Sequence, residues 1–387
     1  MTAPSLQPST VPRPAQYTGE VIYLYAFDVG YELARTPIRE LLGQPVATFQ
    51  VDASKRTPRQ FFFYRPQVLR LPPLERSTAR GPLRVERSVK IFPVGAISLT
   101  IRIPFATDSI HELVDFHDLR FTDGGYLYDE VLATAEEVRK ALEPYIDRPV
   151  AKLADEEAYT VFVVHAPAAV VASAKEHSAE NWLIANRRQV AALLTEEHEL
   201  AHLSSQEADE STSRYLSYYD HDLLVVDWDA ALLIDEPKYV DETVYLLELA
   251  NLQLAELEAY DRILDEVVDR AYRDLSGQRL HTVRGTAKTL RELREIRVDL
   301  ARVSDELENI TKFFGDWHLA RIYKTVADRF HLGDWHRAID DKLATLNDLY
   351  RLLQEDRNYR TMLALEITVV VFFLIELIPL LYPFFKP

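Results

Sequence analysis

The sequence predicts an α+β protein: a mixed N-terminal α/β domain, then long antiparallel coiled-coil-like helices, then one C-terminal transmembrane helix. Proline placement separates the first two parts, because 17 of the 20 prolines lie at or before Pro237 and none occurs from Lys238 to Ile378. Proline disrupts helix interiors, so the proline-free region is expected to be helical. Residues 361–385 are almost entirely apolar. The predicted parts are a disordered N-terminus (1–17), the mixed domain (18–237), a helical coiled-coil stalk (238–360) and the transmembrane helix (361–385).

The mixed domain contains short runs rich in β-branched and aromatic residues, which are typical of strands. The runs expected to form strands are 20–27, 46–51, 60–71, two strands within 84–105, 158–165, and a strand pair within 214–235. Helices are expected at 31–43, 107–118, 126–143 and 180–194. Strands and helices mixed in this order predict an α+β or two-layer domain, but they do not determine the strand order.

Helical patterns dominate after Pro237. One helix is expected over 240–275, and the next carries apolar residues spaced alternately three and four apart, which predicts a coiled-coil seam. The seam residues are Leu293, Ile296, Leu300, Val303, Leu307 and Ile310. A last helix is expected to begin near Asp334 and to run into 361–385. The seam favours either an antiparallel bundle within the chain or pairing with a second protomer.

The apolar C-terminal stretch predicts a single membrane pass. Residues 361–385 would form a helix of about 37 Å, whereas a bilayer's hydrocarbon core is about 30 Å thick. The flanking basic residues favour a cytoplasmic or matrix-side N-terminal body. Glu366 and Glu376 interrupt the run, and a carboxylate at mid-membrane costs about 2.5–3.5 kcal/mol, so both are expected to make intramembrane polar contacts with a neighbouring helix. The alternative is a last helix buried in the protein's own core.

The composition excludes several classes of function. A net charge of −17 argues against a nucleic-acid coat protein, and the lack of cysteine excludes disulfides, thiolate metal sites and a cysteine nucleophile. Residues 55–102 are a local exception, with eleven Lys or Arg and two acidic residues. They are expected to meet anionic lipid headgroups or nucleic-acid phosphates, unless acidic helices of the same chain neutralise them. The candidate contacts are Arg56, Arg59, Arg65, Arg70, Arg84, Arg87 and Lys90.

One motif has catalytic character. His198, Glu199 and His202 form an HExxH sequence, in which two histidines one helical turn apart bind zinc and the glutamate acts as general base. Glu196 and Glu197 directly precede it, whereas such helices are normally uncharged there, so the sequence favours a coincidental match. A zinc site with His198 and His202 as ligands is the alternative.

The other acidic and catalytic patterns point to no enzyme. An acidic cluster around a predicted turn and strand consists of Asp220, His221, Asp222, Asp227 and Asp229. It would bind a hard cation or, more simply, Asp227 and Asp229 would lie on a polar strand face. No P-loop, dinucleotide-binding glycine motif or nucleophile elbow occurs. No cofactor is predicted.

The C-terminal third carries a family resemblance. Leu346–Asn347 leads into an apolar segment that opens on Leu365–Glu366, with a second glutamate at Glu376. This arrangement resembles the YagE-type, required-for-meiotic-nuclear-division family of membrane-anchored proteins, and residues 217–235 and 246–261 resemble an uncharacterised bacterial branch of it. The resemblance implies a membrane-anchored protein and carries over no catalytic residue.

These patterns together predict a non-enzymatic, membrane-anchored scaffold or tethering protein. It is expected to act by homo-oligomerisation or by docking a partner at the membrane, and its partners would be the membrane, further copies of the chain, and a protein or anionic lipid. Nucleic acid is not expected as a partner outside the basic region 55–102. The alternative function is a membrane-tethered zinc metallohydrolase that uses residues 198–202.

Overall fold

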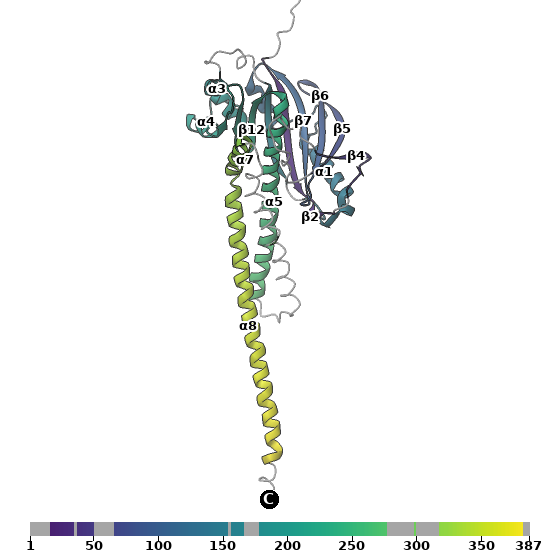
Figure 1. The fold of residues 1–387 in the computed structure, drawn as a ribbon, viewed down its shortest axis with the longest axis vertical. Coiled ribbons are helices and arrows are strands. Elements are labelled where there is room, and N and C mark those ends of the chain that lie inside the picture. Colours follow the sequence, from purple (N-terminus) through teal and green to yellow (C-terminus); the bar gives the residue numbers. More distant parts are fainter. Residues whose placement is uncertain are drawn as a thin grey trace, which may run out of the picture. The chain divides into compact units, whose positions relative to one another are not determined.

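The computed structural model describes residues 16–34, 37–49, 66–153, 156–165, 178–276, 298 and 317–381 (Figure 1). The chain divides into two compact units. Unit 1 comprises Met1–Leu257 and Glu306–Gly333, and unit 2 comprises Glu258–Asp305 and Asp334–Pro387.

Unit 1 is built on a ten-stranded sheet, in the order β10-β11-β12-β9-β1-β7-β6-β5-β4-β3. Its strands are β1 (Tyr17–Asp28), β3 (Glu40–Leu41), β4 (Gln44–Thr48), β5 (Gln67–Thr78), β6 (Gly81–Ile91), β7 (Ala96–Thr107), β9 (Glu157–His165), β10 (Tyr215–Leu216), β11 (Leu223–Val226) and β12 (Ala230–Asp235). β12 pairs with β9 in parallel, and the other neighbours are antiparallel. A second, two-stranded sheet joins β2 (Gly30–Leu33) to β8 (Ile146–Pro149).

The first face of the large sheet holds the main hydrophobic core. Side chains alternate between the faces of a strand, and β1 places Val21, Tyr23, Tyr25 and Phe27 on this face. It is covered by η1 (Ile110–Phe116), α1 (Leu127–Leu142) and α3 (Ala179–Leu194). The short helix α4 (Ser205–Ser211) packs against α3, and η2 (Glu143–Tyr145) directly follows α1.

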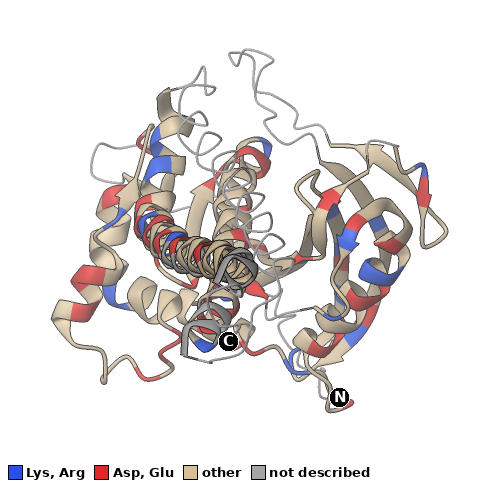
Figure 2. Cartoon of the chain, turned by 90° about the horizontal axis from the view of Figure 1, so that it is seen from below, with Lys and Arg blue, Asp and Glu red and all other residues tan. Residues whose placement is uncertain are grey.

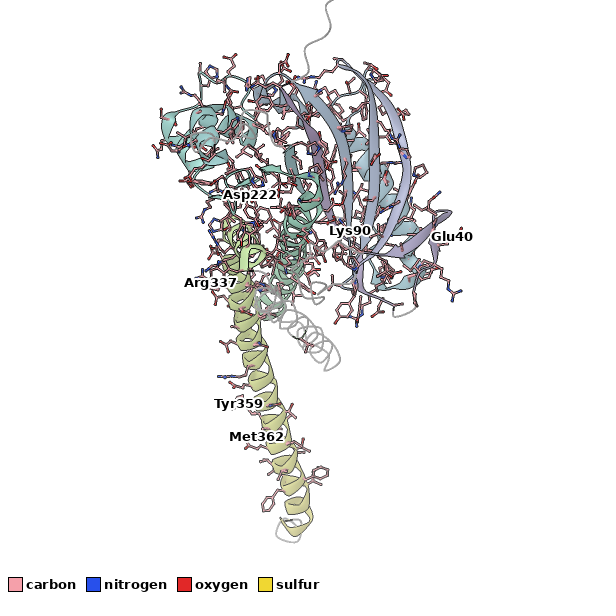
Figure 3. The ribbon with its side chains drawn as sticks, turned by 45° about the horizontal axis from the view of Figure 1, so that its top comes forward. Glu40, Lys90, Asp222, Arg337, Tyr359 and Met362 are labelled. Carbon is pink, nitrogen blue, oxygen red and sulfur yellow. The ribbon has the colours of Figure 1, made fainter. Side chains whose placement is uncertain are left out.

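The second face is covered by the N-terminal part of α5 (Pro237–Ser276), up to Leu257, which lies against the strands in Figure 1. Polar groups join them, because the carboxylate of Glu248 is bonded to the Lys90 ammonium and accepts a hydrogen bond from Ser98 Oγ at 2.6 Å. Both charges are buried, with the Glu248 side chain 1% exposed and that of Lys90 10% exposed. Nearer the start of α5, Asp241 accepts a hydrogen bond from Arg102 at 2.5 Å. Charged residues therefore fix the position of α5 on the sheet (Lys90 is labelled in Figure 3).

A second helix, α7 (Trp317–Arg329), is fixed to the sheet at its C-terminal end. Arg329 forms a buried ion pair with Asp227 in the β11–β12 turn. The hydroxyl of Tyr159 donates to the main-chain oxygen of Asp227 at 3.1 Å, and the Phe330 ring packs edge-on against Tyr159 at 5.0 Å. The end of α7 is thus held by an ion pair and by aromatic packing.

Unit 2 contains the C-terminal part of α5 and most of α8 (Leu332–Leu381). The ammonium of Lys342 lies 2.6 Å from both Asp261 and Asp265 of α5. Leu264 of α5 and Leu343 of α8 are buried. These contacts pair the two helices over the first turns of α8.

The predicted fold class is wrong in its C-terminal part. None of the helices in the described chain combines the length and apolar character that a bilayer span requires. The transmembrane helix at 361–385 and the single-pass membrane localisation, with its cytoplasmic or matrix-side body, are corrected accordingly. The described residues form a mixed α/β structure on a large sheet, without a coiled-coil seam between long helices.

Several predicted elements are present, and one is replaced. The runs 20–27, 84–105 and 158–165 are β1, β6 with β7, and β9, and the expected helices at 126–143 and 180–194 are α1 and α3. The helix predicted over 31–43 is wrong, because this segment forms β2, β3 and a turn at Leu42–Gly43, where both residues have positive φ. The segment 107–118 is a 3₁₀ helix, η1. The seam residues from Leu293 to Ile310 and the N-terminus 1–15 lie outside the described residues.

Candidate functional site

The HExxH residues lie in a loop between α3 and α4 and not on a helix. Glu196 has a φ of +57°, a left-handed conformation that does not continue a helix. Nε2 of His198 lies 3.5 Å from Oδ1 of Asp115, whereas Nε2 of His202 lies 3.5 Å from Oε2 of Glu199. The two imidazoles therefore face different carboxylates, and no group of three potential ligands gathers among the described residues to hold a metal ion. The geometry does not assemble the alternative zinc site.

A cleft of about 580 Å³ lies beside this loop. It is lined by the β5–β6 hairpin, the end of β7, the segment after η1, and by Glu196 and His198. β6 and β7 are paired only as far as Glu86 and Arg102. Further along β7 lies Pro104, which has no N–H to donate to a neighbouring strand. The strands separate at this point, and the cleft occupies the fork between them.

The charged groups at the cleft are paired with one another. Nη2 of Arg80 donates to Oδ2 of Asp115 at 2.6 Å. Nδ1 of the buried His117 ring lies 2.9 Å from Oε1 of Glu196, and this hydrogen bond lowers the pKa of Glu196. These charges are thus balanced within the protein.

The predicted basic contacts are divided between the surface and the interior. Arg70 and Arg84 are exposed. Arg87 donates to Oγ1 of Thr134 at 3.1 Å, and partial burial lowers the pKa of its guanidinium. Lys90 is bonded to Glu248 beneath α5, as described above. Arg56, Arg59 and Arg65 lie outside the described residues, so contact with an anionic surface stays a prediction that rests on two described arginines.

The C-terminal half of α8 carries an exposed apolar surface. Its residues Met362–Ile375 are called here the apolar segment. The large apolar side chains within it are exposed by 39–67%. Glu366, predicted to make an intramembrane contact, is exposed among them, and the side chain of Glu376 lies outside the described residues. In Figure 2 the red and blue positions of α8 give way to tan toward its C-terminal end.

Sequence reasoning missed the two buried charge pairs. Asp227, predicted to lie on a polar strand face, is 4% exposed and bonds Arg329 across 102 positions of the chain. Glu248 lies in the apolar run 244–254 of α5, where an isolated acid among buried positions is a signal of an internal partner. The partner itself, Lys90, cannot be found without the register of the sheet.

Asp235, at the end of β12, gives the fold a pH dependence. Burial raises its pKa from 3.8 to about 6, with the charges of Asp222 and Glu236 adding to the effect. A protein with such a carboxyl loses folding stability as the pH rises from about 4 to 6, because its folded state binds the proton more tightly than its unfolded state does. Asp235→Asn is therefore expected to stabilise the protein at pH 8 by up to about 3 kcal/mol, at about 1.4 kcal/mol per pKa unit.

Urea unfolding of both proteins between pH 3.5 and 8 measures this effect. The two curves should converge toward pH 3.5, where Asp235 is protonated in the folded state and mostly protonated in the unfolded state. Asp147→Asn, at a side chain that is 66% exposed, is the control and should show no such divergence. A constant difference between wild type and Asp235→Asn at all pH values would contradict the assignment.

The comparisons with known proteins identify the N-terminal part of the chain. The family model described as the N-terminal domain of uncharacterized protein MJ0711 matches residues 18–240. The uncharacterized protein MJ0711 of Methanocaldococcus jannaschii is 26% identical over 163 residues, which are 42% of this chain and 50% of that protein. The chain therefore spans about half the length of this curated relative. No solved structure matches.

These findings overturn the predicted kinship with the YagE-type, required-for-meiotic-nuclear-division family. That resemblance rested on residues 346–377, with two supporting stretches at 217–235 and 246–261. The family match covers 18–240 instead, which is the sheet with its first-face helices. The residues that carried the resemblance, 346–377, lie outside the matched range.

Proposed function

Because the chain belongs to the family of the MJ0711 N-terminal domain, whose description names no activity, we propose a function from the structure: it is a non-enzymatic assembly protein. Further copies of the same chain pack around the apolar segment of α8, and unit 1 is the body carried on the assembly. The apolar segment lies beyond the family match. Assembly is therefore assigned to the part of the chain that follows the family domain.

The single observation that carries the proposal is the exposure of the apolar segment on every side. Val369 to Ile375 are seven consecutive apolar positions, each at least 47% exposed. Seven residues make about two helical turns, so no face of this stretch is packed against the part of the chain that the structure describes. A helix that is hydrophobic all round is buried in its working state, and apolar surfaces of this kind mark interaction sites.

A second copy of the chain is the occupant that best fits this geometry. One partner helix would cover one face, whereas a helix apolar on all sides needs several neighbours. A closed symmetric oligomer supplies identical apolar helices around a common axis. The β-branched residues Ile367, Val369 and Val370 suit such packing, because branched side chains fill the core positions of helical oligomers. The hydroxyl of Thr368 donates to Ala364 O at 2.7 Å and needs no further partner.

The arrangement at the HExxH loop supports a non-enzymatic role. The two histidines face different carboxylates, and the cleft beside them has its charges paired within the protein. Neither feature favours the alternative metallohydrolase.

Light scattering coupled to gel filtration tests the proposal on the full chain. The wild type is expected to elute as an oligomer. Val370→Lys/Phe373→Lys places two ammonium groups within the apolar segment and should give a monomer, because each lost apolar contact is worth about 1.5–3 kcal/mol. Tyr359→Lys is the control, since Tyr359 lies on the same helix, is 63% exposed and precedes the apolar segment.

Two outcomes would overturn the assembly proposal. One is a wild-type protein that stays monomeric at all concentrations, whether free or bound to phospholipid vesicles. The other is an oligomer whose size is the same in Val370→Lys/Phe373→Lys as in wild type.

A further inference from the structure

A second exposed surface, unrelated to the apolar segment, lies on unit 1 where β10 turns into β11. Tyr218 is 55% exposed, Tyr219 50% and Trp317, the first residue of α7, 76%. Together with His221 and His318 they form what is called here the aromatic patch. Tyrosine and tryptophan are enriched at protein interfaces and supply most of the binding energy there, so this grouping indicates a docking surface.

The chain holds the aromatic patch in one conformation. Oδ1 of Asp222 accepts hydrogen bonds from the main-chain N–H groups of Tyr218 at 2.7 Å and Tyr219 at 3.2 Å. The Tyr218 ring meets the Tyr219 ring at 4.7 Å and the His318 ring at 4.9 Å. The Tyr219 ring stacks on His221 at 5.4 Å with an interplanar angle of 8°. A patch fixed in this way loses little conformational entropy when a partner binds.

The surroundings of the aromatic patch are acidic. Asp220 and Asp222 lie within the turn (Asp222 is labelled in Figure 3), and Oε1 of Glu236 lies 3.6 Å from Nε2 of His221. Lys238 opposes them, with its ammonium 2.7 Å from Glu236. The charges of Asp222 and Glu236 also contribute to the raised pKa of nearby Asp235. The local potential is therefore negative.

We infer that the aromatic patch docks a lysine- and arginine-rich segment of another polypeptide. Aromatic faces attract ammonium and guanidinium groups through the ring quadrupole, and the carboxylates of Asp220 and Glu236 attract the same groups. The negative charge that favours a basic segment also repels phosphates. Complementary charge sets the choice of partner and speeds the encounter, and the tyrosines provide the contact area.

Calorimetric titration of the full chain with a twelve-residue peptide of lysine, arginine and glycine tests the inference. Tyr218→Ser/Tyr219→Ser removes both rings and is expected to raise the Kd about 5- to 30-fold, because each exposed cation–π contact contributes a factor of a few. Tyr218→Phe/Tyr219→Phe keeps the rings and should bind as wild type does. Added NaCl should weaken peptide binding to wild type and to Tyr218→Phe/Tyr219→Phe alike.

Two controls distinguish peptide binding at the aromatic patch from non-specific attraction to a chain with a net charge of −17. Tyr359→Ser removes a similarly exposed ring elsewhere and should leave the Kd unchanged, and a glutamate-rich peptide of equal length should not bind. A Kd that is the same in Tyr218→Ser/Tyr219→Ser as in wild type would overturn the inference, as would the absence of any binding heat. Far-ultraviolet circular dichroism verifies that the variants are folded. Because the aromatic patch lies on unit 1, this result is independent of whether the chain assembles through α8.

Discussion

Lys90→Met is expected to destabilise the protein by about 3–5 kcal/mol, the cost of leaving one charge of a buried pair without its partner. Lys90 and Glu248 join β6 to α5, and the Glu248 side chain is 1% exposed. The variant leaves a carboxylate with hydrogen bonds from the Ser98 and Thr100 hydroxyls but without a counter-charge. Urea unfolding followed by circular dichroism at pH 7 measures the loss.

The double variant Lys90→Met/Glu248→Met is the matched control. Replacing both members of a buried pair by apolar residues of similar volume is often neutral or stabilising, so most of the lost stability should return. Full recovery is not expected, because the two hydroxyls lose an acceptor. A single variant within about 1 kcal/mol of wild type would show that water reaches Glu248 and would contradict its burial.

Gly95→Ala is expected to cost roughly 4–6 kcal/mol, the upper range for combined overpacking and backbone strain. Gly95 lies in the β6–β7 turn with a φ of +85°, and an added Cβ would lie 2.0 Å from the main-chain oxygen of Gly30. The main-chain oxygen of Gly95 accepts hydrogen bonds from the N–H groups of Val29 at 2.9 Å and Gly30 at 3.1 Å. The obstacle is main chain that is itself bonded to Gly95, so it cannot move aside. Thermal unfolding measures the effect.

Gly43→Ala separates strain from collision. Gly43 has a φ of +71° in the β3–β4 turn, and an added Cβ there would meet no atom within 4 Å. This variant should lose only about 1–2 kcal/mol, the cost of a left-handed alanine. Equal losses for the two alanine variants would mean that the close approach of the β6–β7 turn to Gly30 does not exist in solution.

The strands were predictable where local chemistry decides the structure. The run EVIYLYAF is β-branched and aromatic, and it forms most of β1. Pro93 and Gly95 marked the break between β6 and β7, because a turn with positive φ favours glycine. The order of the strands was not predictable, since the pairing of β1 with both β7 and β9 depends on contacts far apart in the chain.

The candidate site was less predictable because the helix that the HExxH motif requires ends too early. The motif needs residues 198–202 on one helical face, but α3 ends at Leu194 and Glu196 turns into the left-handed region. This end agrees with the helix expected over 180–194, although no glycine or proline marks it. The helix expected over 31–43 failed for a related reason. Its apolar spacing fits a helix, yet the positive φ values of Leu42 and Gly43 suit a hairpin.

Because the chain is synthesised from its N-terminus, the second face of the sheet is exposed to solvent until the helices that cover it have been made. β1, β7 and β9 are all complete by His165, whereas α5 begins only at Pro237 and α7 at Trp317. A nascent chain that has emerged as far as residue 240, the end of the family match, presents Ile22, Leu24 and Val161 with neither helix over them. Bare apolar strands of this kind aggregate or recruit chaperones. A truncated product that ends at 240 would inherit the same exposure permanently, so a stable fragment has to include α5.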